Sequence, residues 1–244
     1  MENPAQHLPW FDIRLPKKAM EYLWDSINNS QCGDARENLA GNISKSVYIK
    51  DKDNWFYENV LKDMLEHLLF KNSWEDYYDV YISKIKSHTK FCLSPFWVNY
   101  QKQYEFNPPH GHNNGNGFSF VVFMKIPTHW KEQHALPFSA NSTVPSASNF
   151  AFLLGQGHEV KAINIPLSPE DEGRILMFPA WLMHQVFPFY GTEEERITIS
   201  GNIRIEMDKE SEKESLELRE QHLEKMEREV AALKNMIQID SGLK

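Results

Sequence analysis

Two histidines separated by one residue, His110 and His112, lie in the segment FNPPHGHNNGNGFSF at residues 106–120. On extended backbone, side chains at positions i and i+2 point to the same face, so this pair can bind a single ion. Imidazole nitrogen is a good ligand for iron, zinc, copper and nickel. In a segment this rich in Pro, Gly and Asn, two histidines can equally be polar residues of an exposed turn. The pair therefore predicts a metal site only if a third ligand comes from elsewhere in the chain.

His184 is the best candidate for that third ligand. It lies in the segment GRILMFPAWLMHQVFPF at residues 173–189. This segment reads as a glycine turn, an apolar strand, Pro179, and a second strand with one histidine among apolar neighbours. A single histidine on an apolar face is usually a core residue with a hydrogen-bond partner. The claim of His184 to be a ligand therefore depends on what lies beside it.

A strand with one polar face follows, in the segment ERITISGNIRI at residues 195–205. Alternation places isoleucines on one face and polar residues on the other, namely Arg196, Thr198, Ser200, Asn202 and Arg204. A guanidinium binds a carboxylate through two hydrogen bonds, and a hydroxyl two residues along the strand can add a third. We therefore expect Arg196 and Thr198 to bind a carboxylate, whereas Arg204 suits an ordinary solvent-exposed edge.

Two helices are expected in the first third of the chain. One starts at Pro16 and carries apolar residues at helical spacing up to residue 27, as proline favours the first turn. The other, over residues 55–70, has a longer apolar stripe after a cap at Asp53 or Asn54. The remaining segments of this region read as an extended arm and a loop, over residues 1–15 and 28–46.

From about residue 76, short runs rich in Val, Ile, Phe and Tyr alternate with Pro, Gly, Asn and Ser. Such runs predict strands, here over residues 78–85, 95–105, 117–126, 149–154, 160–165, 173–178, 182–188 and 196–206. Many short strands at regular intervals indicate a sandwich or jelly roll, not a parallel α/β sheet. The expected fold is therefore α+β and mainly β: a sandwich or jelly roll supported by N-terminal helices.

The last part of the chain is charged and has a helical pattern. Apolar residues recur every seven positions, at Leu216, Leu223, Val230 and Ile237, which predicts a short heptad helix. This helix packs on the same domain, forms a coiled-coil oligomer, or docks a partner. The expected organisation is a supporting region, a mainly β core and a helical tail, over residues 1–75, 76–206 and 208–240.

Composition excludes several classes of protein. A net charge of −8 argues against a general nucleic-acid binder, which carries a basic surface. An aromatic content of 13% argues against a disordered chain. No stretch has the length of a membrane span, and the N-terminus lacks the pattern of a signal peptide. The two cysteines, Cys32 and Cys92, suggest no disulfide framework, so we expect a cytoplasmic protein with no membrane partner.

Taken in order, these motifs resemble the Fe(II)- and 2-oxoglutarate-dependent oxygenases. The order is His-x-His before an apolar strand, then Gly-x-x-x-x-Phe-Pro, a distal histidine, and Arg-x-Thr twelve residues after it. The chain looks in particular like a branch common in phages, including phages of marine cyanobacteria. In that branch a His-x-His stretch precedes a strand like SGVYYL, and FPSWLxHxVxP leads to RISISFN. The corresponding stretches here are FSFVVFMKIP, FPAWLMHQVFP and RITISGN, and the resemblance covers residues 95–206.

The resemblance implies a double-stranded β-helix, a form of jelly roll, with a metal centre and a co-substrate site. Fe(II) would be held by His110 and His184 near the mouth of the barrel. Arg196, helped by Thr198, would bind the distal carboxylate of 2-oxoglutarate. Asn99 could add a hydrogen bond to this co-substrate, or its strand could simply pack the core. The implied reaction uses O2, converts 2-oxoglutarate into succinate and CO2, and hydroxylates a C–H bond of an unidentified substrate.

The third ligand is where the sequence departs from the wider family, whose motif is His-x-Asp or His-x-Glu. Three imidazoles leave the metal one negative charge short of the usual set of two histidines and one carboxylate. His112 is the preferred third ligand, because the similar phage branch also carries His-x-His. The alternatives are that His112 pairs with Asn114 while His110 lies outside, or that Glu105 supplies a carboxylate.

Two other functions fit the same residues. One is a non-catalytic jelly roll, a structural or adaptor protein whose metal only links strands and whose tail forms oligomers. The other is a cupin-like metalloenzyme with three histidines around Zn, Fe or Mn and no 2-oxoglutarate. Arg196 discriminates, because the oxygenase requires this residue to face the metal across the barrel. The sequence names no substrate, and both a small molecule and a protein are candidates.

Overall fold

The computed structural model describes residues 10–71, 89–112, 116–156 and 158–207, together with single positions between 213 and 228. The chain divides into one unit of residues 1–72 and 91–205 and a second of residues 73–90 and 206–244. The single described positions in the tail are helical. The heptad residues and the strand expected over 78–85 lie outside the described residues. The helical tail and the boundaries expected near residues 76 and 208 therefore stay predictions.

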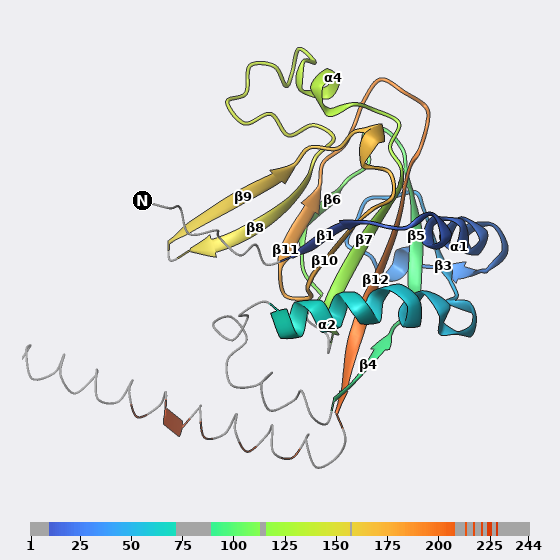
Figure 1. Cartoon of the computed structure of the whole chain (residues 1–244). Helices are drawn as coiled ribbons and strands as arrows, with labels where there is room; N and C mark the ends of the chain where they lie inside the picture. The colour runs from blue at the N-terminus through green and yellow to red at the C-terminus, as the bar shows by residue number, and fades with distance from the viewer. Residues whose placement is uncertain are drawn as a thin grey trace, which may run out of the picture. The chain divides into compact units, whose positions relative to one another are not determined.

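The first unit contains two β-sheets (Figure 1). In the described part of the chain, the larger sheet has eight strands, in the order β1-β10-β7-β12-β5-β3-β2 with β4 also paired to β12. The smaller sheet has four, in the order β6-β11-β8-β9. The strands of the larger sheet are β1 (Phe11–Arg14), β2 (Gln31–Asp34), β3 (Lys45–Ile49), β4 (Thr89–Leu93), β5 (Phe96–Gln101), β7 (Asn116–Lys125), β10 (Arg174–Pro179) and β12 (Arg196–Met207). Those of the smaller sheet are β6 (Asn107–His110), β8 (Phe150–Gln156), β9 (Glu159–Ile165) and β11 (Met183–Val186). This arrangement confirms the expected α+β, mainly β fold with a double-stranded β-helix.

The central strand β7 shows why an uninterrupted apolar run forms a strand here. It pairs with β10 on one side and β12 on the other, and its successive side chains point to opposite faces. Phe120 faces outward to Phe56, with ring centroids 5.9 Å apart, whereas Phe123 packs into the core between the sheets. Because both faces are covered, the strand needs no alternation of polar and apolar residues.

The core between the sheets is largely aromatic. Phe123, Phe150, Phe152 and Phe178 bring β7, β8 and β10 together there. Trp10, from the segment read as an extended arm, stacks on Phe152 with ring centroids 4.3 Å apart. The start of the described chain is therefore part of the core, and it continues into the edge strand β1 beside β10.

Both expected helices are present. The first is α1 (Lys17–Asn29), and the second is a π-helical turn, η3 (Tyr57–Leu61), continued by α2 (Lys62–Lys71). The second helix lies on the outer face of the larger sheet (Figure 1), where Phe56, just before it, contacts Phe96 of β5 and Phe120 of β7.

The expected cap of the second helix is wrong. Asp53 and Asn54 both have positive φ, 55° and 56°, and lie in the turn before the helix. The carboxylate of Asp51 accepts instead, from the backbone N–H groups of Phe56 at 2.9 Å and Tyr57 at 3.0 Å. A sequence pattern that counts back from the first apolar residue misses this cap, because the turn inserts extra residues between cap and helix.

Three segments contain structure that the sequence did not predict. The supposed loop 28–46 holds β2 and the start of β3, which extend the larger sheet beyond β5. The proline-rich residues 107–110 form β6, paired with β11. The connection between β7 and β8 contains a short helix, α4 (Trp130–His134). No helix in the described part of the chain is both long and apolar enough to cross a membrane.

Candidate active site

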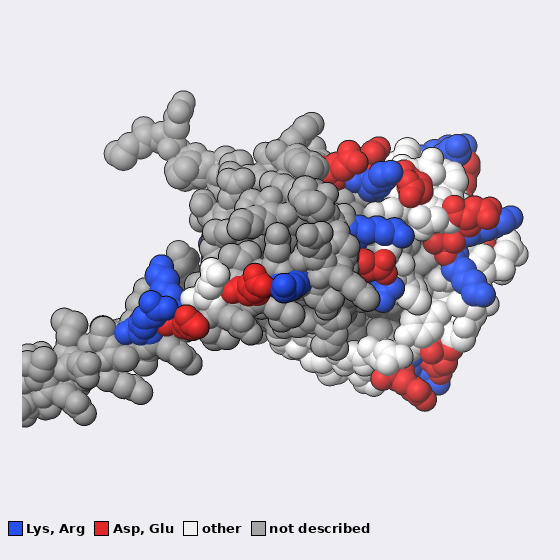
Figure 2. All heavy atoms as spheres, turned by 90° about the horizontal axis from the view of Figure 1, so that it is seen from below, with Lys and Arg blue, Asp and Glu red and all other residues white. Residues whose placement is uncertain are grey.

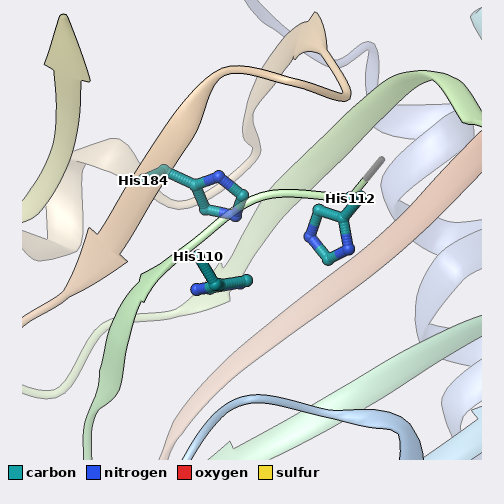
Figure 3. Close-up of side chains that lie close together, drawn as sticks. All are labelled: His110, His112 and His184. Carbon is teal, nitrogen blue, oxygen red and sulfur yellow. The ribbon is translucent and has the colours of Figure 1, made fainter. Parts of the chain in front are cut away.

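The three histidines meet where β6 and β11 pair (Figure 3). His110 lies directly opposite His184 in the antiparallel register. His112 follows β6 by two residues, and its backbone N–H donates to Ala180 O at 2.7 Å. The ring centroids of His110 and His184 are 4.2 Å apart, and that of His112 lies 5.2 and 5.3 Å from them. One nitrogen from each residue lies within 4.8 Å of the others, so all three can reach one ion.

Backbone carbonyls orient two of these rings. His110 Nδ1 lies 2.7 Å from the carbonyl oxygen of Pro108, and His184 Nδ1 lies 3.0 Å from that of Leu182. A carbonyl can only accept, so each Nδ1 carries the proton and each Nε2 presents a lone pair. Metal-binding histidines are oriented in this way by their second nitrogen. The residues therefore fit a metal that prefers imidazole, including Fe(II).

The surroundings keep the imidazoles neutral. His184 is 5% exposed and lies against the rings of Phe150 and Phe178, with centroids 5.7 and 4.8 Å away. Burial lowers the pKa of His110, lowers that of His184 well below its usual value, and lowers that of His112 to about 4. The neighbouring imidazole of His110 adds to the effect on His112 and His184. Neutral imidazole is the form that binds a metal.

Arg196, at the start of β12, is fully buried and has no acidic partner among the described residues. Its Nη2 donates to the carbonyl oxygen of Ser148 at 2.9 Å and to Ser148 Oγ at 2.5 Å, and its Nη1 donates weakly to Gln101 Oε1 at 3.4 Å. The buried Nε has no hydrogen-bond partner in the part of the chain that the structure describes. The guanidinium carbon lies 5.0 Å from the centroid of the Phe189 ring. Burial lowers the pKa of Arg196 to about 9, which leaves it charged at neutral pH.

A buried cation with an unsatisfied donor fits an anionic ligand. Burying a charge is costly unless it is paired and hydrogen-bonded, and the neutral partners of Arg196 pair none of its charge. A carboxylate accepts from a guanidinium in two-point fashion. The distal carboxylate of 2-oxoglutarate is therefore a ligand that this residue can satisfy.

Thr198 and Asn99 face each other beside Arg196. They are cross-strand partners in the β5–β12 register, as are Arg196 and Gln101. Asn99 Nδ2 lies 3.4 Å from Thr198 Oγ1, and Asn99 Oδ1 accepts from Ser46 Oγ at 2.7 Å. The polar face expected for residues 196–200 is thus the inward face of the sheet. Arg204, further along β12, is exposed.

One cavity brings the sequence-predicted residues together. Its lining includes His110, His112, His184, Arg196, Thr198 and Asn99, and among described residues it includes no Asp or Glu. The carboxylate of Glu105 is engaged elsewhere, accepting from the backbone N–H groups of Ser44 and Lys102 at 2.9 Å each. The alternative in which Glu105 completes the metal site therefore finds no support, and Asn114 lies outside the described residues.

Sequence reasoning missed Ser148, the principal partner of Arg196. Ser148 lies 48 positions before Arg196 in the connection between β7 and β8, and a serine before a strand carries no recognisable signal. A groove beside His112 was also missed. It has a volume of about 360 Å³ and shares Leu39, Trp97 and His112 with the inner cavity. Its other lining residues are Cys32, Asn38, Tyr48, Pro95 and Asn202.

The outer surface differs from this uncharged groove. On the face shown in Figure 2, lysines and arginines lie among aspartates and glutamates over the described residues. A nucleic-acid footprint requires clustered positive charge. The described residues of this face present no such cluster.

A comparison with known families agrees with the geometry. The model of the family "Putative 2OG-Fe(II) oxygenase" matches residues 95–202. A search of curated proteins found no match to the chain.

Several solved structures are similar to the chain at low identity. A Pseudomonas putida prolyl-4-hydroxylase is 13% identical with a TM-score of 0.46, covering 80% of this chain and 92% of its own. The viral collagen prolyl hydroxylase of Paramecium bursaria Chlorella virus-1, in complex with 2-oxoglutarate, is 13% identical with a TM-score of 0.45, covering 83% and 99%. An oxidoreductase of the 2OG-Fe(II) oxygenase family from Burkholderia pseudomallei is 10% identical with a TM-score of 0.47, covering 81% and 86%.

The family match spans β5 to the middle of β12 and includes the three histidines and Arg196. It confirms the resemblance drawn from the sequence, while the narrower phage branch stays a prediction. The enzyme class is that of a 2-oxoglutarate-dependent dioxygenase, and the cofactors are Fe(II), 2-oxoglutarate and O2. The part of the chain that the family model matches, residues 95–202, thus resembles the 2OG-Fe(II) oxygenases.

Proposed function

We propose that the protein hydroxylates a C–H bond of a substrate that enters beside His112. The overall reaction is R–H + 2-oxoglutarate + O2 → R–OH + succinate + CO2. One observation supports it most: three converging imidazoles line the same cavity as a buried arginine that has no acidic partner among the described residues. Bound Fe(II) would supply the redox chemistry that couples decarboxylation of the keto acid to hydroxylation.

Each residue has a distinct role in this proposal. His110, His112 and His184 hold the metal through neutral nitrogens. Arg196 binds the distal carboxylate of 2-oxoglutarate, and Thr198 adds a hydrogen bond from its hydroxyl. Asn99, held by Ser46, keeps that hydroxyl in place.

Arg196 also separates this proposal from its two alternatives. A metal that only links strands needs no buried cation nearby, and a three-histidine enzyme without 2-oxoglutarate needs none either. Both would pay the desolvation cost of Arg196 without gaining a ligand. The oxygenase is the function in which this cost is offset by binding.

The groove beside His112 supports a substrate without formal charge on the part that enters. Its lining residues are uncharged, and they include polar side chains, Asn38, Tyr48 and Asn202, together with Trp97 and Pro95. A charged group placed there would lose water without gaining a partner. Both a small molecule and a protein segment meet this requirement, and the cytoplasm is the location that the sequence predicts for either.

The test is an anaerobic titration of the metal-free protein with Fe(II) and 2-oxoglutarate. The expected results are a weak visible charge-transfer band from the chelate and release of succinate when air is admitted. Arg196→Gln should weaken 2-oxoglutarate binding by about two orders of magnitude, the usual cost of removing one partner of a buried charge pair.

Arg204→Gln is the matched control, because it removes an exposed arginine from the same strand. It should leave the band and the succinate yield unchanged. A folded wild-type protein that binds iron but gives neither band nor succinate would exclude 2-oxoglutarate dependence.

A further inference from the structure

Ser148 has an unusual backbone conformation at a buried position. Its φ is 70°, in the left-handed region that strains an ordinary L-residue and that glycine adopts freely. Among the described residues, Asp53, Asn54 and Tyr104 are the other non-glycines with positive φ, and none of those three is fully buried. Ser148 is 0% exposed. A glycine would satisfy the backbone here, so the serine indicates a use for its hydroxyl.

That hydroxyl and the carbonyl of the same residue converge on one group. Both accept from Arg196 Nη2, at 2.5 Å and 2.9 Å. Two acceptors from one residue on one nitrogen fix the rotation of the guanidinium as well as its position. The weak contact to Gln101 and the unpartnered Nε lie on the remaining edges, which are left for a ligand.

Ser148 is itself held from two sides. Its N–H donates to Pro188 O at 2.8 Å, and its Oγ lies 3.2 Å from Thr128 Oγ1. The next residue, Asn149, accepts from the N–H of Phe187 at 2.9 Å. These contacts hold the strained conformation in place, as strained residues at functional sites require.

We infer that Ser148 is the positioning residue for Arg196 and thereby sets the preference for a co-substrate with a distal carboxylate. This inference rests on the proposed function. Without the Ser148 hydroxyl, the guanidinium loses one of its two hydrogen bonds to Ser148 and samples orientations in which its free edge no longer meets the carboxylate. Binding of the keto acid end at the metal does not depend on it.

The experiment compares two ligands that differ only at the distal end. Anaerobic Fe(II)-loaded protein is titrated with 2-oxoglutarate and with 2-oxopentanoate, which has the same keto acid and length but no second carboxylate. Ser148→Gly relieves the strain and removes the hydroxyl, whereas Ser148→Ala removes the hydroxyl and keeps the strain. Both variants should raise the Kd for 2-oxoglutarate roughly tenfold, as for one lost hydrogen bond to a charged group. The Kd for 2-oxopentanoate should stay that of the wild type.

A double-variant cycle checks that the effect runs through Arg196. In an Arg196→Lys background, which lacks the planar guanidinium, Ser148→Gly should add less than twofold. Equal preference of wild type and Ser148 variants for 2-oxoglutarate would overturn the inference. So would equal weakening of both ligands, because that indicates a merely structural role. A wild type that does not distinguish the two ligands would instead contradict the proposed role of Arg196.

Discussion

The two ends of the cavity are built in different ways. At the histidine end, His110 and His184 are cross-strand partners, and each ring is oriented by a carbonyl two residues earlier in its own chain segment. At the arginine end, the side chain comes from β12 but is oriented by Ser148, 48 positions away. The histidine rings are therefore oriented by residues near them in the sequence, whereas the guanidinium is oriented by a residue far from it in the sequence.

This difference has a physical consequence. A ring fixed by its own strand moves only if the strand moves, so the histidine end should tolerate changes in distant loops. The guanidinium depends on a loop that is itself held by Phe187 and Pro188. Changes there should therefore reach 2-oxoglutarate binding while sparing the metal.

Loss of His184 should give the largest effect. His184→Ala removes the most buried of the three imidazoles, and Fe(II) affinity should fall by more than about 100-fold, beyond the cost of losing only a supporting partner. Anaerobic Fe(II) titration measures it. His158→Ala, an exposed histidine on β8–β9, is the control. Unchanged iron binding in His184→Ala would show that the metal does not bind at the histidine end.

Exchange of His112 for a carboxylate should strengthen Fe(II) binding at the histidine end. His112→Asp supplies the negative charge that three imidazoles lack, so Fe(II) affinity should rise, by about tenfold for a gain near 1.4 kcal/mol. His112→Asn has the same size as the aspartate without the charge and should bind iron more weakly than wild type. Equal affinities of the Asp and Asn variants would show that His112 lies outside the coordination sphere.

A change near the segment that holds Ser148 should have a smaller effect, on 2-oxoglutarate binding but not on Fe(II) binding. Gln133 of α4 exchanges two 2.9 Å hydrogen bonds with the backbone of Tyr190, next to the segment that holds Ser148. Gln133→Ala should raise the Kd for 2-oxoglutarate by roughly threefold to tenfold, the usual range for coupling through intermediate residues. Isothermal titration with both ligands measures it. An equal loss of Fe(II) affinity would contradict the distinction between the two ends.

A change in the outer scaffold should leave both ends unaffected. Asp51→Ala removes the cap of the second helix and the 2.5 Å hydrogen bond from Tyr22, and should lower the free energy of unfolding by about 1–2 kcal/mol. Urea unfolding measures this loss. Weakened binding of iron or 2-oxoglutarate at temperatures where the variant stays folded would mean that the helix also supports the cavity.

Strands whose burial is visible in the pattern of apolar side chains are predicted well from the sequence. The runs at 117–126, 149–154 and 196–206 correspond closely to β7, β8 and β12, because burial on one or both faces shows in the residue types. The prediction fails where a strand forms only because it pairs with a neighbouring strand. β2 is polar and exposed and β6 contains two prolines, so neither has the composition of a strand.

The candidate site divides in the same way. His110, His112, His184 and Arg196 could be proposed from the sequence because their types and spacing carry chemistry. Ser148 could not, because its role comes from a positive φ and from loop packing that no local pattern encodes. The uncharged groove was likewise hidden, since its residues come from separate segments between Cys32 and Asn202.

Because β6 contains two prolines, we expect the stability of the folded protein to depend on metal supply. Pro108 and Pro109 have no N–H to donate, so β6 has two fewer backbone donors for its pairing with β11. A metal bound by His110 and His184 would cross-link this weak pair, and the folded state would gain stability with rising metal concentration by mass action. Hydrogen exchange at β11 should then slow on adding Fe(II) under anaerobic conditions. In a cell short of iron, the pairing of β6 with β11 would open more often, and the protein would be degraded sooner.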